Sequence, residues 1–113
     1  MSPRDRVYVG HMLDMTTKSI EKIRGLTREQ FDSDENLRLA LIYLIQIIGE
    51  AASRVSSSYR DEHPDVPWSE ITGMRHKVVH DYLGVDEDIV WRVANDDLPP
   101  LAETLTTILG ESS

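Results

Sequence analysis

The sequence predicts an all-α fold, an up-and-down bundle of four to five helices. Apolar residues recur at intervals of three and four through most of the chain. No segment alternates apolar and polar residues with the period of two that is typical of a half-buried strand. The chain has 113 residues, of which 40% are hydrophobic, so we expect one domain spanning residues 1–113.

The first helix is predicted to begin at Ser2 and Pro3, an N-cap followed by a proline in the first helical position. It carries an apolar stripe at helical spacing, formed by Tyr8, Met12, Met15, Ile20 and Ile23. Gly25 is expected to end it. A one-turn helix should follow, because Thr27 and Gln30 have the spacing of a capping box.

Ser33 is predicted to cap a second long helix that runs to about Tyr59 without a proline. Its broad apolar face makes it the most buried element, with Leu37, Leu41, Leu44, Ile45, Ile48 and Val55 as core candidates. Gly49 and the neighbouring alanines are small, so another helix is expected to approach closely there.

A third helix is expected to start at Pro67 and Trp68, and we expect Trp68 to be a packing anchor rather than a platform for stacking a base. Three consecutive carboxylates, residues 86–88, suit a helix N-terminus better than a metal ion, and predict a fourth helix through about Asn95. A last helix follows from about Leu98, with Gly110 at its end.

Charge is distributed unevenly in this chain of net charge −8. Residues 1–60 carry nine Lys and Arg against eight Asp and Glu, whereas residues 61–113 carry three against twelve. Most non-specific nucleic-acid binders are basic, so a general RNA or DNA coat protein is excluded. Any contact with nucleic acid is expected at a small, locally positive site, or with help from another copy or a partner.

That site is predicted within residues 75–82, where Arg75, His80 and Tyr82 lie close together in sequence. A guanidinium can clamp a phosphate through a planar fork of donors, and an imidazole can exchange a proton near neutral pH. Lys77 adds a second cation to this acidic half of the chain. The combination suggests chemistry on a phosphodiester.

Helical geometry limits this hypothesis. On one continuous helix Arg75 and Tyr82 share a face, but His80 lies roughly 140° around from Arg75. The misalignment would be repaired if Gly84, as a helix C′ residue, loosened the last turn, or if a second copy faced the first across a dimer axis. His76 and His80 also have a spacing that can bind zinc, but no cysteine or HEXXH glutamate accompanies them, so no metal site is predicted.

Several separated motifs resemble the HepT-type toxins of the HEPN superfamily, small helical-bundle ribonucleases. In order they are Ile47-Ile48-Gly49-Glu50-Ala51-Ala52, Pro67-Trp68, Gly73-Met74-Arg75, His80-Asp81-Tyr82, Val90-Trp91 and Leu98-Pro99. The resemblance spans nearly the whole chain. It implies a HEPN-like homodimer that cleaves RNA without a metal or other cofactor, using Arg75 and His80 in the dimer cleft.

The resemblance also implies a toxin of a type VII-like toxin–antitoxin system. Its partner would be an MntA-like nucleotidyltransferase antitoxin that silences it by AMPylation of Tyr82. His76 departs from the pattern, because relatives often have Asn after the Arg, and its role is left open. Glu50 is assigned either to an ion pair with Arg54 or to support of Arg75 or His80.

The alternative is a non-catalytic HEPN module that binds a nucleotidyltransferase or a nucleotide. Neither function calls for a membrane. Nothing at the N-terminus resembles a signal peptide, and the longest apolar run, residues 39–45, is too short to span a bilayer. The absence of cysteine is compatible with a reducing compartment, so a cytoplasmic location is expected.

Overall fold

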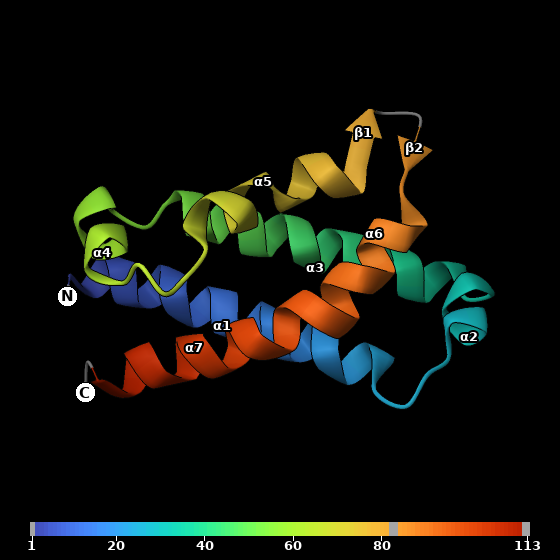
Figure 1. Ribbon diagram of the computed structural model, residues 1–113, viewed down its shortest axis with the longest axis horizontal. Coiled ribbons are helices and arrows are strands. Elements are labelled where there is room, and N and C mark those ends of the chain that lie inside the picture. Colours follow the sequence, from blue (N-terminus) through green and yellow to red (C-terminus); the bar gives the residue numbers. More distant parts are fainter. Residues whose placement is uncertain (1, 82–83, 112–113) are drawn as a thin grey trace.

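The computed structural model describes residues 2–81 and 84–111, with the backbone alone for residues 75, 79–81, 84–85 and 111. Four longer helices run up and down along one another (Figure 1): α1 (Pro3–Ile23), α3 (Glu35–Ser53), α5 (Trp68–Val78) and α7 (Leu98–Glu111). Shorter helices connect them: α2 (Arg28–Asp32), α4 (Ser57–Glu62) and α6 (Glu87–Arg92). The predicted all-α bundle is confirmed.

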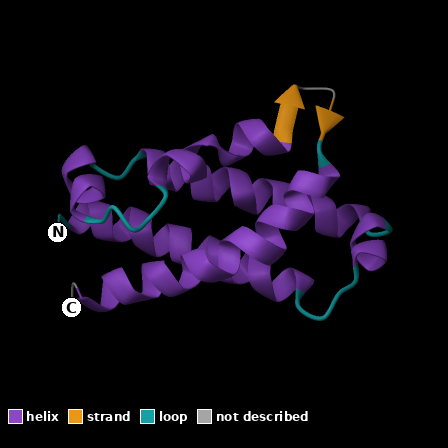
Figure 2. Ribbon diagram, viewed as in Figure 1, coloured by secondary structure: helices purple, strands orange, loops and turns teal. Residues whose placement is uncertain are grey.

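Two short strands interrupt the helical pattern that the sequence predicts. Strands β1 (Val79–Asp81) and β2 (Gly84–Val85) pair antiparallel and project from one end of the bundle (Figure 2). Their three and two residues are too few to show an alternating pattern in the sequence. They leave the fold class unchanged, but they lie in the stretch that carries the predicted site.

Helices α1 and α3 form the centre of the bundle. Helix α1 packs against α3 and α7, and α3 packs against α5 on its other side. The fully buried side chains come from all of these helices and form one core, which includes Val9, Met12, Phe31, Leu41, Ile45, Ile48, Val78, Leu98, Leu105 and Ile108. Removing this apolar surface from water is the main force that holds the helices together.

The predicted caps of the first two helices are confirmed. The Ser2 side chain accepts a hydrogen bond from the backbone N–H of Asp5 at 3.0 Å, and a proline follows Ser2 in the first helical position. After α1, Gly25 adopts a φ of 77°, a left-handed conformation that suits glycine best. Thr27 and Gln30 form the reciprocal capping box that begins α2.

The predicted second long helix is wrong at both ends. Asp34 rather than Ser33 caps α3, because the Asp34 carboxylate accepts from the Leu37 N–H while the Ser33 hydroxyl turns back to a carbonyl of α2. The helix ends at Ser53 rather than Tyr59, because Ser56 adopts extended backbone and caps α4 instead. Serine is a favourable N-cap residue, so a new helix starting at Ser56 can replace continuation of α3. The helix propensities of the residues do not indicate which outcome occurs.

The fourth helix is helical through its predicted end at about Asn95, but it changes type after Arg92, where a π-helical turn, η1 (Val93–Asp97), joins α6 to α7 without a loop. In this turn the Leu98 N–H donates to the Val93 carbonyl, five residues back. Pro99 and Pro100 follow and have no N–H to continue the ordinary register, which accounts for the change. Asp86 caps α6 through the Ile89 N–H at 3.1 Å, as predicted for this acidic run.

No described helix is both long and apolar enough to cross a membrane.

Candidate functional site

The predicted site lies where α5 meets the hairpin. One face of α5 is buried, and Trp68, Ile71, Met74 and Val78 are between 0% and 8% exposed. Trp68 is the packing anchor that the sequence predicts, and its indole N–H donates to the His63 carbonyl at 2.9 Å. Because these anchors fix both ends of α5, the backbone of Arg75 has a defined place on the bundle.

Helix α5 approaches α3 closely at Gly49, as the small residues there predict. A Cβ added to Gly49 would lie 3.1 Å from the carbonyl oxygen of Ile71 and 3.8 Å from that of Thr72. Only the absence of a side chain allows the two backbones to come so near. This contact lies one helical turn before Arg75 and fixes the helix that carries it against the centre of the bundle.

The structure corrects the geometry assumed for Arg75 and His80. Arg75 belongs to α5, but the helix ends at Val78 and His80 belongs to β1. The backbone N–H of Asp86 donates to the Val78 carbonyl at 3.0 Å, and Val79 pairs with Val85 across the hairpin. Consecutive β-branched valines favour this extended pairing over another helical turn.

Two consequences follow from the early end of α5. Gly84 starts β2 and is not a helix C′ residue, so the prediction of a loosened last helical turn is wrong. The angle of 140° between Arg75 and His80 no longer applies, because the two residues do not share a helix. Tyr82, the expected site of modification, lies outside the described residues.

The neighbouring predicted residues, His76 and Lys77, are exposed on α5. Because His80 is on β1, His76 and His80 do not have the helical i, i+4 relationship that suggested zinc. Among the described side chains, no group of three His, Cys, Asp or Glu residues lies close enough to hold a metal ion. Because His76 and Lys77 are exposed, both could contact a ligand near α5, but nothing in their surroundings assigns either residue a role.

Glu50 forms the predicted ion pair with Arg54, at 2.9 Å between carboxylate and guanidinium. Glu50 and then Tyr8 raise the pKa of Arg54 by accepting its hydrogen bonds. Hydrogen bonds from Arg4 and then from Arg54 lower the pKa of the Tyr8 phenol. A supporting role of Glu50 toward Arg75 or His80 stays a prediction.

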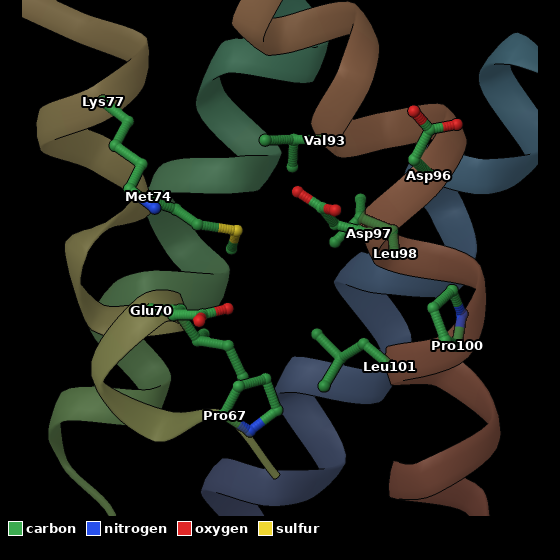
Figure 3. Close-up of a pocket in the computed structure, with 11 residues that line it drawn as sticks. Pro67, Glu70, Met74, Lys77, Val93, Asp96, Asp97, Leu98, Pro100 and Leu101 are labelled. Carbon is green, nitrogen blue, oxygen red and sulfur yellow. The ribbon is translucent and has the colours of Figure 1, made fainter.

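Sequence reasoning missed a cavity of about 220 Å³ beside α5. It lies between α5 and the η1–α7 junction (Figure 3), and buried apolar side chains form its floor: Ile71, Met74, Val93, Leu98 and Leu101. The Glu70 and Asp97 carboxylates point into it from opposite walls (Figure 3). No local signal in the sequence brings residues 70 and 97 together, because the cavity depends on how α5 packs against η1.

The cavity changes the acidity of one of its carboxyl groups. Partial desolvation of its carboxyl group raises the pKa of Asp97, although the residue is exposed, and the nearby Asp96 and Glu70 carboxylates raise it further. Arg92 and Lys77 oppose this shift. Asp97 is therefore a carboxylate whose negative charge is less stable than that of an ordinary aspartate.

The fold and the site define a class of protein: a small helical bundle with an Arg–His pair at a helix–hairpin junction. The family model for Ribonuclease HepT-like proteins matches residues 12–108, most of the chain. The chain belongs to the Ribonuclease HepT-like family, and the resemblance drawn from its separated motifs is confirmed.

Individual relatives support the same assignment. A protein of Caldanaerobacter subterraneus subsp. tengcongensis, provisionally named an RNase, is 36% identical over 104 residues, covering 92% of this chain and 93% of that protein. The "Probable ribonuclease HepT" of Thermococcus cleftensis is 36% identical over 93 residues, covering 79% of this chain and 84% of that protein. No solved structure matches the chain significantly.

Proposed function

We propose that this chain is an endoribonuclease that cleaves RNA without a metal ion, using Arg75 and His80. The observation that carries the proposal is membership in the Ribonuclease HepT-like family, joined to an Arg–x4–His pair within the matched residues. RNA supplies its own nucleophile in the 2′-OH. Cleavage then needs a base for that hydroxyl, an acid for the leaving oxygen, and positive charge beside the phosphorus.

In this mechanism His80 transfers protons and Arg75 stabilises the charge that develops on the phosphorane. A single chain offers one His80, whereas the reaction calls for both an acid and a base. A symmetric homodimer would place two copies of each residue along one cleft. Arg75 and His80 belong to consecutive elements, α5 and β1, so each copy would bring both residues to such a cleft.

The same proposal includes regulation at Tyr82. The chain would act as the cytoplasmic toxin of a type VII-like toxin–antitoxin pair, and a MntA-like nucleotidyltransferase would transfer AMP to the Tyr82 hydroxyl. Tyr82 is two residues beyond His80 in the sequence. A phosphodiester attached there would bring negative charge and bulk to the residues that must receive RNA.

A second candidate function, a non-catalytic module that binds a nucleotidyltransferase or a nucleotide, is favoured by charge. The half of the chain that carries the motif holds only three Lys and Arg against twelve Asp and Glu. Such a surface attracts RNA poorly. Recruitment of a protein partner would not require the phosphate contacts that RNA cleavage does.

The test is RNA cleavage by the purified protein without its partner, after intact mass has shown that Tyr82 carries no AMP. Cleavage that is lost in the His80→Ala variant supports the ribonuclease. Absence of cleavage across structured and single-stranded RNAs, with binding to the nucleotidyltransferase retained, supports the module instead. Sedimentation of the same sample determines whether the active form is a dimer, and an active monomer would overturn the composite cleft.

A further inference from the structure

We propose that the cavity between α5 and the η1–α7 junction binds a small organic cation, an ammonium group on a short apolar arm. Recognition would come from Glu70, Asp97 and the apolar floor, so the inference does not depend on ribonuclease activity. It follows from the shape of the cavity, from the chemistry of its two ends, and from the unusual backbone that forms one of its walls.

The size and floor of the cavity define the apolar part of the ligand. Its volume of about 220 Å³ is below the range of about 300–1,000 Å³ that holds drug-sized ligands. The side chains of Met74, Val93 and Leu101 are 5%, 3% and 6% exposed and line it with carbon and sulfur. A short alkyl chain fills such a space and gains from leaving water, whereas a large ring system or a nucleotide does not fit.

The rim defines the charge of the ligand. Glu70 on α5 and Asp97 on η1 direct their carboxylates toward the same space from opposite sides (Figure 3). Lys77 also lines the cavity, but it forms no ion pair with Glu70 or Asp97, and these three residues are all described with their side chains. Carboxylates therefore outnumber cations at the rim, which favours a cationic occupant.

A metal ion is a poorer occupant than an organic cation. No group of three candidate ligands lies close enough to hold a metal ion among the described residues. Hard divalent cations need six or more oxygen ligands, and much of this lining is apolar. An ammonium group has three N–H donors, which a carboxylate and water at the exposed rim can satisfy, and its alkyl arm uses the floor that a metal ion would leave unfilled.

The wall that carries Asp97 is a π-helical turn, residues 93–97. Such turns are rare and occur often at functional sites. Asp96 and Asp97 are adjacent in this turn, yet Figure 3 shows the Asp97 carboxylate turned into the cavity and the Asp96 carboxylate turned away. An ammonium group beside Asp97 would offset the burial and the neighbouring acidic charge that disfavour its ionised form.

The experiment titrates the purified full chain with n-pentylamine and follows the backbone amide signals by NMR. We expect saturable shifts at Met74, Lys77, Val93 and Leu98. Pentanol has the same arm without the charge, and methylamine has the charge without the arm, so both should bind at least about fivefold more weakly. Magnesium chloride at matched ionic strength tests the metal alternative.

Asp97→Asn and Glu70→Gln should each weaken pentylamine binding by about fivefold, the upper end for an exposed ion pair. Asp96→Asn is the matched control, because it removes the same charge from the adjacent residue, whose carboxylate points away. If Asp96→Asn and Asp97→Asn weakened pentylamine binding equally, the loss would reflect net charge alone, and the proposed site would be wrong.

Two further results would overturn the proposal. One is pentylamine shifts scattered over other acidic surfaces instead of the cavity lining. The other is binding of pentanol as tight as that of n-pentylamine, since the cavity would then accept the apolar arm without using the charge. RNA cleavage enters none of these measurements, so their failure is distinct from failure of the ribonuclease proposal.

Discussion

Asp5 accepts two hydrogen bonds from Ser56, one from its backbone N–H at 2.8 Å and one from its hydroxyl at 2.7 Å. These residues lie 51 positions apart, so the pair ties the first turn of α1 to the start of α4. Asp5 is only 5% exposed. Burial by itself raises the pKa of this carboxyl, but the hydrogen bonds from Ser56 and then Ser2 outweigh it and lower the pKa below the ordinary value of 3.8.

The first prediction is that Asp5→Asn destabilises the fold by about 2 kcal/mol near pH 7, because hydrogen bonds to a charged group contribute about 1.5–3 kcal/mol. A lowered folded-state pKa stabilises the protein above the unfolded pKa, and this stabilisation is lost as pH falls through the folded value. The difference in free energy of unfolding between the variant and the parent should therefore become smaller as the pH falls below about 4. Urea unfolding at stepped pH values measures it.

Asp14→Asn provides the control for that series, because Asp14 is exposed on the same helix. We expect it to change the free energy of unfolding by less than about 0.5 kcal/mol at any pH. A gap for Asp5→Asn that stays constant from neutral pH to acid would contradict the ionised role of Asp5.

The second prediction concerns Gly49, where α3 and α5 approach. Alanine at this position gains up to about 1 kcal/mol of helix propensity, but its Cβ would press on the Ile71 carbonyl oxygen, and overpacking costs about 1–3 kcal/mol. We expect Gly49→Ala to be destabilising by about 1 kcal/mol. In Gly10→Ala the added Cβ meets nothing within 4 Å, so that control should be stabilising by about 0.5–1 kcal/mol in the same urea experiment.

The sequence predicts those features of the fold that depend on residues close together in the chain. The cap at Ser2, the box at Thr27 and Gln30, and the cap at Asp86 are set by neighbours within three residues, and all are confirmed. The break after Ser53 is different. Ser56 caps α4 while its hydroxyl also donates to Asp5, a residue on another helix that no local pattern connects to it.

The candidate site divides in the same way. Arg75 and His80 are predicted from their residue types alone, without any assumption about the fold. The family membership predicted from the separated motifs is confirmed by the match to residues 12–108. The helical geometry assumed for His80 is wrong, because the chain leaves the helix after Val78 and Val79 pairs with Val85 instead. The cavity was not predicted at all, since Glu70 and Asp97 are brought together only by packing of α5 beside η1.

The third prediction is that Arg75→Ala and His80→Ala each reduce RNA cleavage by at least about a hundredfold, the smaller end of what one proton-transfer or electrostatic group contributes. Circular dichroism and thermal unfolding should remain close to those of the parent. His76→Ala, an exposed neighbour on α5, serves as the comparison and should retain more activity than either. Undiminished cleavage in His80→Ala would remove His80 from the mechanism.

The fourth prediction is that RNA cleavage persists in excess EDTA. The proposed chemistry uses only an imidazole and a guanidinium to move protons and stabilise charge. Initial rates should agree within about twofold with and without chelator, after any effect of ionic strength on RNA binding has been matched. Loss of activity in EDTA that magnesium or manganese restores would replace the metal-free mechanism with a metal-assisted one.

The fifth prediction is that Tyr82→Phe retains RNA cleavage but escapes silencing by the nucleotidyltransferase. The substitution removes only the hydroxyl that would accept AMP, and neither Arg75 nor His80 changes. Without that hydroxyl, no phosphodiester can form on the side chain to compete for the Arg75 guanidinium or to block RNA. Each protein is incubated with the nucleotidyltransferase and ATP, then divided between intact-mass analysis and an RNA cleavage assay. The parent chain should gain the mass of AMP and lose cleavage together, whereas the Phe variant should show neither change. If the variant gains AMP and is silenced to the same extent, another residue is the switch and the assignment of Tyr82 is wrong.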